Sequence, residues 1–153
     1  MGAFQPADAE FERRVRESFE RQGVMRLIGG RLGRVEPGRV DIELAFREDL
    51  SQQHGFFHAG ITSTIADSAG GYAAYTLFPA DSSVLTVEFK INLIAPAHGE
   101  KLIATGRVKK SGRTLTICEF EVVVIQGGQG RTCALGLQTL MCLQGRKDMP
   151  QSD

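Results

Sequence analysis

Residues 52–72 read QQHGFFHAGITSTIADSAGGY, and they carry a single acidic residue, Asp67. Ile61, Ile65 and Tyr72 recur at helical spacing, while the alanines and glycines between them leave little bulk on the other faces. This pattern predicts a helix that is enclosed by the rest of the protein. A charged carboxylate is costly in such a place unless it is paired or used chemically. No basic side chain stands three or four positions from Asp67, so a catalytic role is favoured over a structural ion pair.

The composition predicts one globular domain over residues 1–153, because 42% of the residues are hydrophobic and 24% are charged. Basic and acidic residues number 18 each, so no net field attracts nucleic acid or an anionic membrane. No apolar run approaches the ~20 residues of a membrane-spanning helix, and residues 1–20 are charged rather than signal-like. We therefore expect a cytoplasmic protein that binds neither nucleic acid nor membrane.

The cysteines are odd in number, have no CxxC spacing and lie in strand-like runs, at Cys118, Cys133 and Cys142. Free cysteines in such runs usually act as small buried hydrophobic side chains. His54 and His98 stand outside any spacing that is typical of a metal site. We therefore expect neither a metal nor a cofactor.

The periodicity of the chain predicts the remaining elements. Residues 6–22 indicate an amphipathic N-terminal helix that ends at Gly23. The expected strands cover residues 25–35, 39–46, 84–93, 101–109, 114–125 and 132–143. Over 84–93, apolar residues alternate with polar ones, which predicts a strand with one apolar face. Residues 144–153 are expected to form a flexible tail.

This order of elements argues for an α+β fold, in which a twisted antiparallel sheet wraps around one central helix. A single sheet of this length cannot enclose both sides of the helix, and it also has an edge strand to protect. Edge-to-edge pairing of two copies would solve both problems. We therefore expect a symmetric dimer.

Several short motifs follow one another in an order that resembles a known family. They are His58-Ala59-Gly60, Asp67 nine positions after His58, the strand 84–92 leading into Ala95-Pro96-Ala97, Gly106-Arg107-Val108 and Gly112-Arg113-Thr114. Over residues 24–143 the chain resembles the hotdog-fold acyl-CoA thioesterases of the PaaI-like type. The resemblance implies a hotdog fold and hydrolysis of an acyl-CoA thioester to a carboxylic acid and coenzyme A. It also implies a homo-oligomer, either a dimer or a tetramer built as a dimer of dimers.

The resemblance further implies roles for individual residues. Asp67 is the nucleophile or the general base, and the backbone N–H of Ala59, where the family usually has Gly, polarises the thioester carbonyl. Gln52 stands where relatives often place an Asn that orients the attacking water. Thr86 stands where some relatives carry a Ser that binds this water. We expect these four residues to be catalytic.

A second set of residues is expected to bind substrate. His58 and Gly60 belong to the turn at the start of the helix, and His58 resembles a structural residue of this turn more than an acid or base. Lys109, Lys110 and Arg113 flank a hairpin turn, where they form either a solvated tip or a contact for the phosphates of coenzyme A. The sequence leaves both roles of this tip open.

Two other functions stay open. A hotdog hydratase or dehydratase needs an acid and a base that reach the acyl chain, commonly an Asp with a His a few residues later. No His follows Asp67 until His98, which disfavours this chemistry. A non-catalytic acyl-CoA sensor would bind the same ligand without the acid. Thioester hydrolysis is therefore favoured over both, although the pattern does not identify the acyl group.

Overall fold

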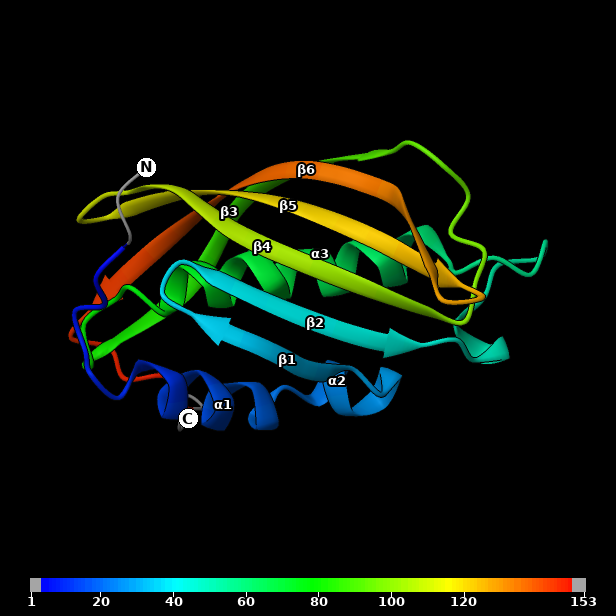
Figure 1. Cartoon of the computed structure of the whole chain (residues 1–153). Coiled ribbons are helices and arrows are strands. Elements are labelled where there is room, and N and C mark those ends of the chain that lie inside the picture. The colour runs from blue at the N-terminus through cyan, green and yellow to red at the C-terminus, as the bar shows by residue number, and fades with distance from the viewer. Residues whose placement is uncertain (1–3, 150–153) are drawn as a thin grey trace.

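The computed structural model describes residues 4–149. Within them, six strands form one antiparallel sheet in the order β1-β2-β4-β5-β6-β3 (Figure 1). The strands are β1 (Arg31–Glu36), β2 (Arg39–Ala45), β3 (Ser82–Leu93), β4 (Lys101–Ser111), β5 (Leu115–Gln126) and β6 (Gln129–Gln144). The helices are α1 (Phe11–Arg21), α2 (Gly23–Ile28) and α3 (Ala59–Tyr75), with a short 3-10 turn at Glu48–Leu50. The predicted α+β class is confirmed.

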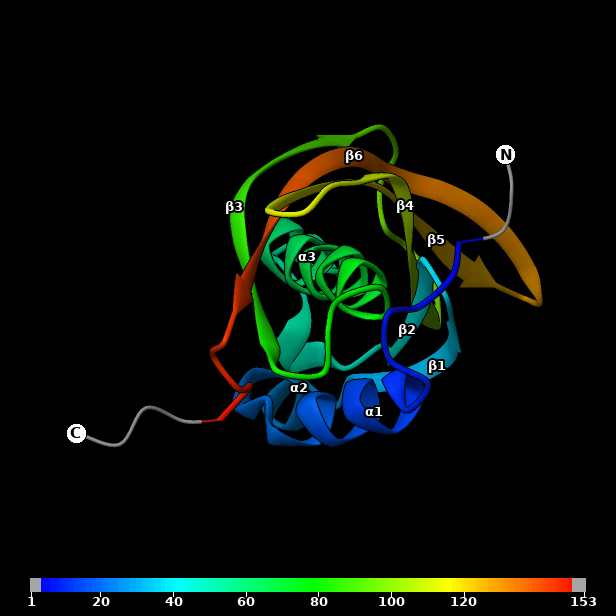
Figure 2. The same cartoon turned by 90° about the vertical axis from the view of Figure 1, so that its left-hand side faces the viewer.

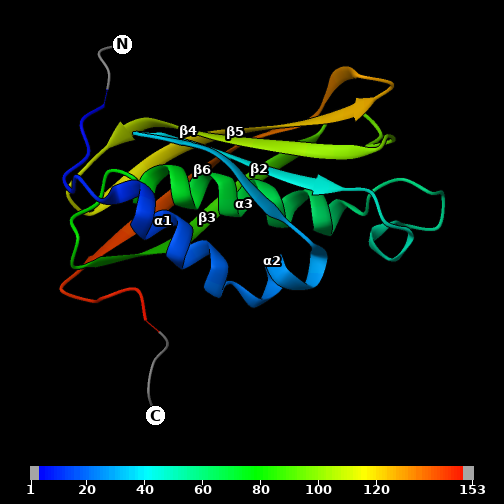
Figure 3. The same cartoon turned by 60° about the horizontal axis from the view of Figure 1, so that its bottom comes forward.

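The sheet curves around α3, which lies against its concave face (Figure 2). Helix and strands share one hydrophobic core, to which α3 contributes fully buried side chains such as Ile65, Ala66, Ala69 and Ala73. Helices α1 and α2 lie along the side of α3 that the sheet leaves open (Figure 3). The helix that carries Asp67 is therefore held between the sheet and the N-terminal helices.

No helix within residues 4–149 is long and apolar enough to cross a membrane. The cytoplasmic location stays a prediction. The part of the predicted tail from residue 150 onward lies outside the described residues, whereas Gln144 ends β6 and Asp148 contacts Arg21 of α1.

Small residues allow α3 to lie directly on the sheet. A Cβ atom at Gly106 of β4 would lie 2.4 Å from the carbonyl carbon and oxygen of Ala69 and 2.5 Å from Gly70 Cα. These neighbours are backbone atoms, which cannot turn away as the end of a side chain could. The whole helix would have to shift to admit one methyl group.

Gly106→Ala is therefore expected to lower the free energy of unfolding by about 3 kcal/mol, a typical cost of overpacking a core. Urea denaturation of the purified variant measures this loss. Gly71→Ala on α3 is the matched control, because its Cβ would meet only Leu140 Cδ1, at 4.0 Å, and Ala is favoured over Gly within a helix. Equal losses in the two variants would contradict the close approach as the cause.

The segment after α1 differs from the predicted strand. Residues 25–28 belong to helix α2, and Gly23, which was expected to end the first helix, begins α2 instead. The helix ends at Gly29, whose φ of 79° lies in the left-handed region and whose N–H donates to Met25 O at 2.9 Å. Met25 and Ile28 are both buried, and their spacing of three residues fits a helical turn. The predicted strand over 25–35 was therefore wrong in its first half.

A β-bulge in β3 changes which of its side chains face α3. Thr86 pairs with Leu140, and Glu88 pairs with Thr139, so that Val87 has no partner on β6. Residues directly opposite each other share a face of the sheet, and Leu140 is fully buried against α3. Thr86 therefore points inward, while Glu88 points outward. The prediction of one continuous apolar face was wrong, because the bulge reverses the alternation after Thr86.

Candidate active site

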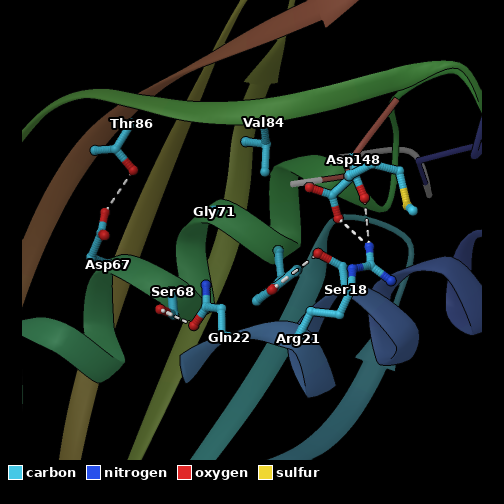
Figure 4. A pocket seen from close by; sticks show the side chains of 11 residues that line it. Ser18, Arg21, Gln22, Asp67, Ser68, Gly71, Val84, Thr86 and Asp148 are labelled. Atoms are coloured by element: carbon cyan, nitrogen blue, oxygen red, sulfur yellow. Dashed lines mark hydrogen bonds and ion pairs between the residues drawn. The ribbon is translucent and has the colours of Figure 1, made fainter. Parts of the chain in front are cut away.

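Asp67 lies in the middle of α3 and is half-buried. Thr86 of β3 donates from Oγ1 to Asp67 Oδ1 at 2.8 Å, a contact drawn in Figure 4. Gln138 of β6 donates from Nε2 to the same carboxylate oxygen at 3.3 Å and to the backbone oxygen of Asp67 at 3.2 Å. Among the described residues no donor meets Asp67 Oδ2. This oxygen is therefore available to a ligand.

The surroundings of Asp67 shift its acidity in two opposing directions. Burial raises the pKa of Asp67 above its ordinary value, and the hydrogen bonds from Thr86 and Gln138 oppose this rise because they favour the charged form. A carboxylate with a raised pKa is a stronger base than one in water. The two donors thus hold an activated carboxylate in one orientation.

Asp67 and Thr86 line a cavity of about 340 Å³ whose walls come from α1, α3, the start of β3 and the segment at residues 148–149 (Figure 4). The other polar side chains of the cavity pair among themselves, Ser18 Oγ with Tyr72 Oη at 3.2 Å, Ser68 Oγ with Gln22 Oε1 at 3.3 Å, and Arg21 with Asp148 at 2.8 Å. Because Arg21 and Asp148 form an ion pair with each other, Asp67 is the one charged side chain among the described residues of the cavity wall that has no ionic partner. The volume falls within the range of ligand pockets, roughly 300–1,000 Å³.

A second group of predicted site residues lies at the start of α3. His58 caps the helix, because its Nδ1 accepts a hydrogen bond from Gly60 N at 2.9 Å. This contact uses the Gly60 N–H, whereas the N–H of Ala59 meets no acceptor in the described part of the chain. Gln52 and Ala59 line a surface hollow together with Phe56. A free N–H at a helix start suits a developing oxyanion.

The two groups are too far apart to act on one carbonyl within a single chain. Eight positions of α3 separate Ala59 from Asp67, which corresponds to about 12 Å along the helix axis. A carbonyl carbon in contact with Asp67 therefore lies far from the Ala59 N–H of the same chain. The predicted catalytic set divides into Asp67 with Thr86 and Ala59 with Gln52.

The three cations predicted to meet coenzyme A lie at the end of β4 and in the turn before β5. This turn is the tip of the β4–β5 hairpin in Figure 1. Lys109 forms an ion pair with Glu119 at 3.2 Å, whereas Lys110 and Arg113 are exposed and form no ion pair with any described residue. Because a strand rises about 3.3 Å per residue, β4 places this tip roughly 30 Å from its other end, near which α3 begins. The tip is thus far from the group at Ala59 within one chain. It lies nearer to Thr86, because Ser111 pairs with Thr116, Thr116 pairs with Leu140, and Leu140 pairs with Thr86.

Gln138 was not predicted as a site residue. It is fully buried and lies on the inner face of β6, next to Leu140. A polar side chain at an inward position of an otherwise apolar strand was the available signal. Its contact with Asp67 joins residues 71 positions apart, and no local pattern reports such a contact.

The cysteines are buried and unpaired, in agreement with their predicted role as small hydrophobic side chains. Burial raises the pKa of Cys118 to about 12, so its thiol stays protonated at neutral pH. Within residues 4–149, no three His, Cys, Asp or Glu side chains come together as metal ligands do. The expectation that the protein needs no metal stays a prediction.

The sequence profile of the Thioesterase superfamily matches residues 54–131, which is half of the chain. The matched stretch contains α3 with Asp67, β3 with Thr86, and the β4–β5 hairpin. The chain belongs to this superfamily. The prediction of a thioester hydrolase is therefore confirmed.

Two solved structures and one curated relative extend this result. A thioesterase family protein from Silicibacter pomeroyi is 45% identical, with a TM-score of 0.87, over 88% of this thioesterase and 99% of that chain. The E. coli PaaI protein has a TM-score of 0.81 at 18% identity, over 92% of this chain and 99% of that one, which shows the fold alone. Human acyl-coenzyme A thioesterase 13 is 28% identical over 104 residues, 67% of this chain and 72% of that protein. The predicted hotdog fold is confirmed, and the resemblance to the PaaI protein is confirmed in its fold.

Proposed function

We propose that this thioesterase hydrolyses an acyl-CoA thioester, with Asp67 as the nucleophile or the general base. The observation that carries the proposal is the Asp67 carboxylate, whose Oδ1 is held by Thr86 and Gln138 while Oδ2 is left free beside a cavity. A fixed, partly desolvated carboxylate next to space for an acyl group suits attack on a carbonyl carbon. The human relative named an acyl-coenzyme A thioesterase supports coenzyme A as the thiol half of the substrate.

The reaction needs a second group in either role of Asp67. Attack on the carbonyl carbon, by a water that gives its proton to Asp67 or by Oδ2 itself, places negative charge on the carbonyl oxygen. A backbone N–H stabilises this charge, and the N–H of Ala59 is free to do so. The C–S bond then breaks, the coenzyme A thiolate takes up a proton, and the acid leaves. In the nucleophilic route, water first hydrolyses the acid anhydride formed with Asp67.

We infer that each site combines two chains, with Asp67 and Thr86 from one protomer and Ala59 and Gln52 from its partner. The separation of about 12 Å along α3 supports this arrangement. The free edge of β3 supports it too, because β6 is the strand's one neighbour among the described residues and Leu85 on β3 is 56% exposed. Pairing of two such edges would cover both and join two copies. The proposed assembly is a dimer, or a tetramer made of two dimers, and sedimentation of a species with the mass of one chain would contradict it.

A hydrolysis screen over short, medium, long-chain and aryl-acyl-CoA thioesters tests the proposed activity. Ranked rates of coenzyme A release would name the acyl class. Binding without release would favour the acyl-CoA sensor, and addition of water to an enoyl-CoA without release would favour the hydratase. No His is among the described residues that line the cavity of Asp67, so nothing there supports the hydratase.

Neutral replacements of Lys109, Lys110 and Arg113 are expected to raise KM for acyl-CoA about tenfold and to leave kcat unchanged. The phosphates of coenzyme A lie far from the bond that breaks, so they bind equally well in the ground state and the transition state. Steady-state kinetics of the triple variant measure the effect. Added salt is expected to raise the wild-type KM in the same direction, because exposed ionic contacts are screened.

An acyl-pantetheine thioester is the control for this prediction, because it lacks the nucleotide phosphates. Its kinetics are expected to be equal in the wild type and the variant. Since Lys109 already pairs with Glu119, replacing Lys110 and Arg113 alone is expected to reproduce most of the effect. Equal losses with both substrates would assign the hairpin tip to folding or assembly.

A further inference from the structure

The amide of Gln138 is buried in a way that stability alone does not explain. Its Nε2 donates to Asp67 Oδ1 and to the Asp67 backbone oxygen, whereas its Oε1 meets no donor in the described residues. Turning the amide over would place Oε1 against two oxygens and lose both hydrogen bonds, which fixes this orientation. A buried acceptor without a donor is unfavourable. An apolar side chain of the same size would therefore suit the core better.

Helix α3 is adapted to this amide. A Cβ at Gly70, three residues after Asp67, would lie 2.1 Å from Gln138 Oε1. Any other residue at this position would push the amide out of reach of the carboxylate. Glycine within a helix is itself unfavourable compared with Ala. Gly70 and Gln138 are thus each unfavourable for stability, and together they allow the Gln138 N–H to bind the Asp67 carboxylate.

We propose that Gln138 is a positioning residue for Asp67, whose Oδ1 it holds together with Thr86 so that Oδ2 stays free for the reaction. The proposal rests on the proposed catalytic function of Asp67. Two donors from different strands on one carboxylate oxygen restrict rotation of the Asp67 side chain more than a single hydroxyl donor does. They also favour the ionised form of the acid, as the direction of their effect on its pKa indicates.

No other charged group in the described chain contacts Asp67. Arg21 and Asp148, in the same cavity, pair with each other, and the hydroxyl of Tyr72 on α3 is held by α1. Strands β2 and β4 turn aliphatic side chains and glycine toward α3, and β5 presents Cys118, whose pKa burial raises to about 12. Strands β3 and β6 reach the carboxylate through its two donors. The acidity of Asp67 therefore depends on these donors and on burial.

Gln138→Met tests the proposal, because methionine keeps the length and approximate volume of the side chain and has no N–H. Loss of a donor to the charged form raises the pKa of Asp67. The acidic limb of kcat/KM against pH is therefore expected to move to higher pH. The ¹³C NMR titration of the Asp67 carboxyl carbon, assigned by its absence in Asp67→Asn, is expected to move equally. The melting temperature is expected to be unchanged or higher, since the unpaired acceptor is gone.

Thr139→Val is the matched control. Thr139 is the next residue of β6, and its hydroxyl donates to Glu88 on the outer face of the sheet. This variant also loses a hydrogen bond from β6 to another element, and it is expected to leave the pH profile and the Asp67 titration unchanged. Gly70→Ala keeps Gln138 but displaces its amide, and it is expected to give the same upward shifts as Gln138→Met. It serves as the second test if the Met variant does not fold.

The two readouts separate this proposal from the proposed function. Unchanged titration of Asp67 in Gln138→Met, with acyl-CoA hydrolysis retained, would overturn the positioning role and leave the function intact. If the Asp67 titration shifts in Gln138→Met but the wild-type protein hydrolyses no acyl-CoA, the positioning role is supported and the proposed function is overturned. A fall in melting temperature without any shift in titration would show a purely structural role and overturn the proposal.

Discussion

Asp67→Asn is expected to lower kcat for acyl-CoA hydrolysis by about 10²- to 10⁴-fold, the range for loss of a positioned catalytic base. The asparagine keeps the geometry of the site, because its Oδ1 still accepts from Thr86 and Gln138. What changes is the free position, where an NH₂ group replaces Oδ2. Rates over the acyl-CoA panel measure the loss. A rate within a few-fold of the wild type would remove Asp67 from the mechanism.

The same variant carries its own control for folding. Because the pKa of Asp67 is raised in the folded protein, the folded state binds this proton more tightly than the unfolded chain does. The resulting stabilisation is present below the ordinary pKa of Asp and is lost as pH rises through the raised value. At neutral pH the ionised carboxylate thus costs stability, and Asn removes that cost. We expect a melting temperature at pH 7 equal to or above that of the wild type.

Two inactive variants are expected to restore each other's activity when they are refolded together. Ala59→Pro removes the N–H proposed to bind the carbonyl oxygen, with an expected loss of about 10²- to 10³-fold in kcat. Proline suits the first position of a helix, and His58 before it already has an extended backbone, with φ −63° and ψ 140°. The fold should therefore be kept. In a mixed dimer with Asp67→Asn, one of the two sites joins an intact Asp67 to an intact Ala59 across the interface.

An equal mixture that assembles at random is expected to regain about one quarter of the wild-type activity per chain, because half of the dimers are mixed and each has one intact site. The two variants refolded separately and then combined as folded proteins are the control. Activity that stays at the level of the single variants after joint refolding would place a complete site within one chain. That result would contradict the two-chain site while leaving the role of Asp67 in place.

The parts of the fold that depend on local patterns could be predicted from the sequence. The run of small residues with Ile61 and Ile65 at helical spacing located α3, and alternation located most of the sheet. Asp67 could be singled out because an acid in an apolar run stands out within a single sequence. The short apolar stretch at Met25 and Ile28 is compatible with a strand or a helix. In the structure it is a helix, which Gly29 ends with a left-handed backbone conformation.

The missed features depend on contacts between distant parts of the chain. The inward direction of Thr86 follows from the extra residue at Val87, because alternation alone cannot register a bulge. Gln138 meets Asp67 only after β6 has paired beside β3. The division of the predicted set into two groups became clear only from the length of helix between Ala59 and Asp67. Local periodicity contains none of this information.

The wall of the cavity beside Asp67 has a consequence for how this enzyme can diversify. Ser18, Arg21 and Asp148 of that wall lie outside residues 54–131, the stretch that the superfamily profile matches and that holds Asp67 itself. Substitutions at these positions change the wall of the proposed acyl cavity without altering the stretch that the profile matches. In the proposed mechanism, acyl selectivity and bond cleavage therefore lie on separate segments of the chain. A library confined to these two chain ends is the economical starting point for redesigning the acyl preference.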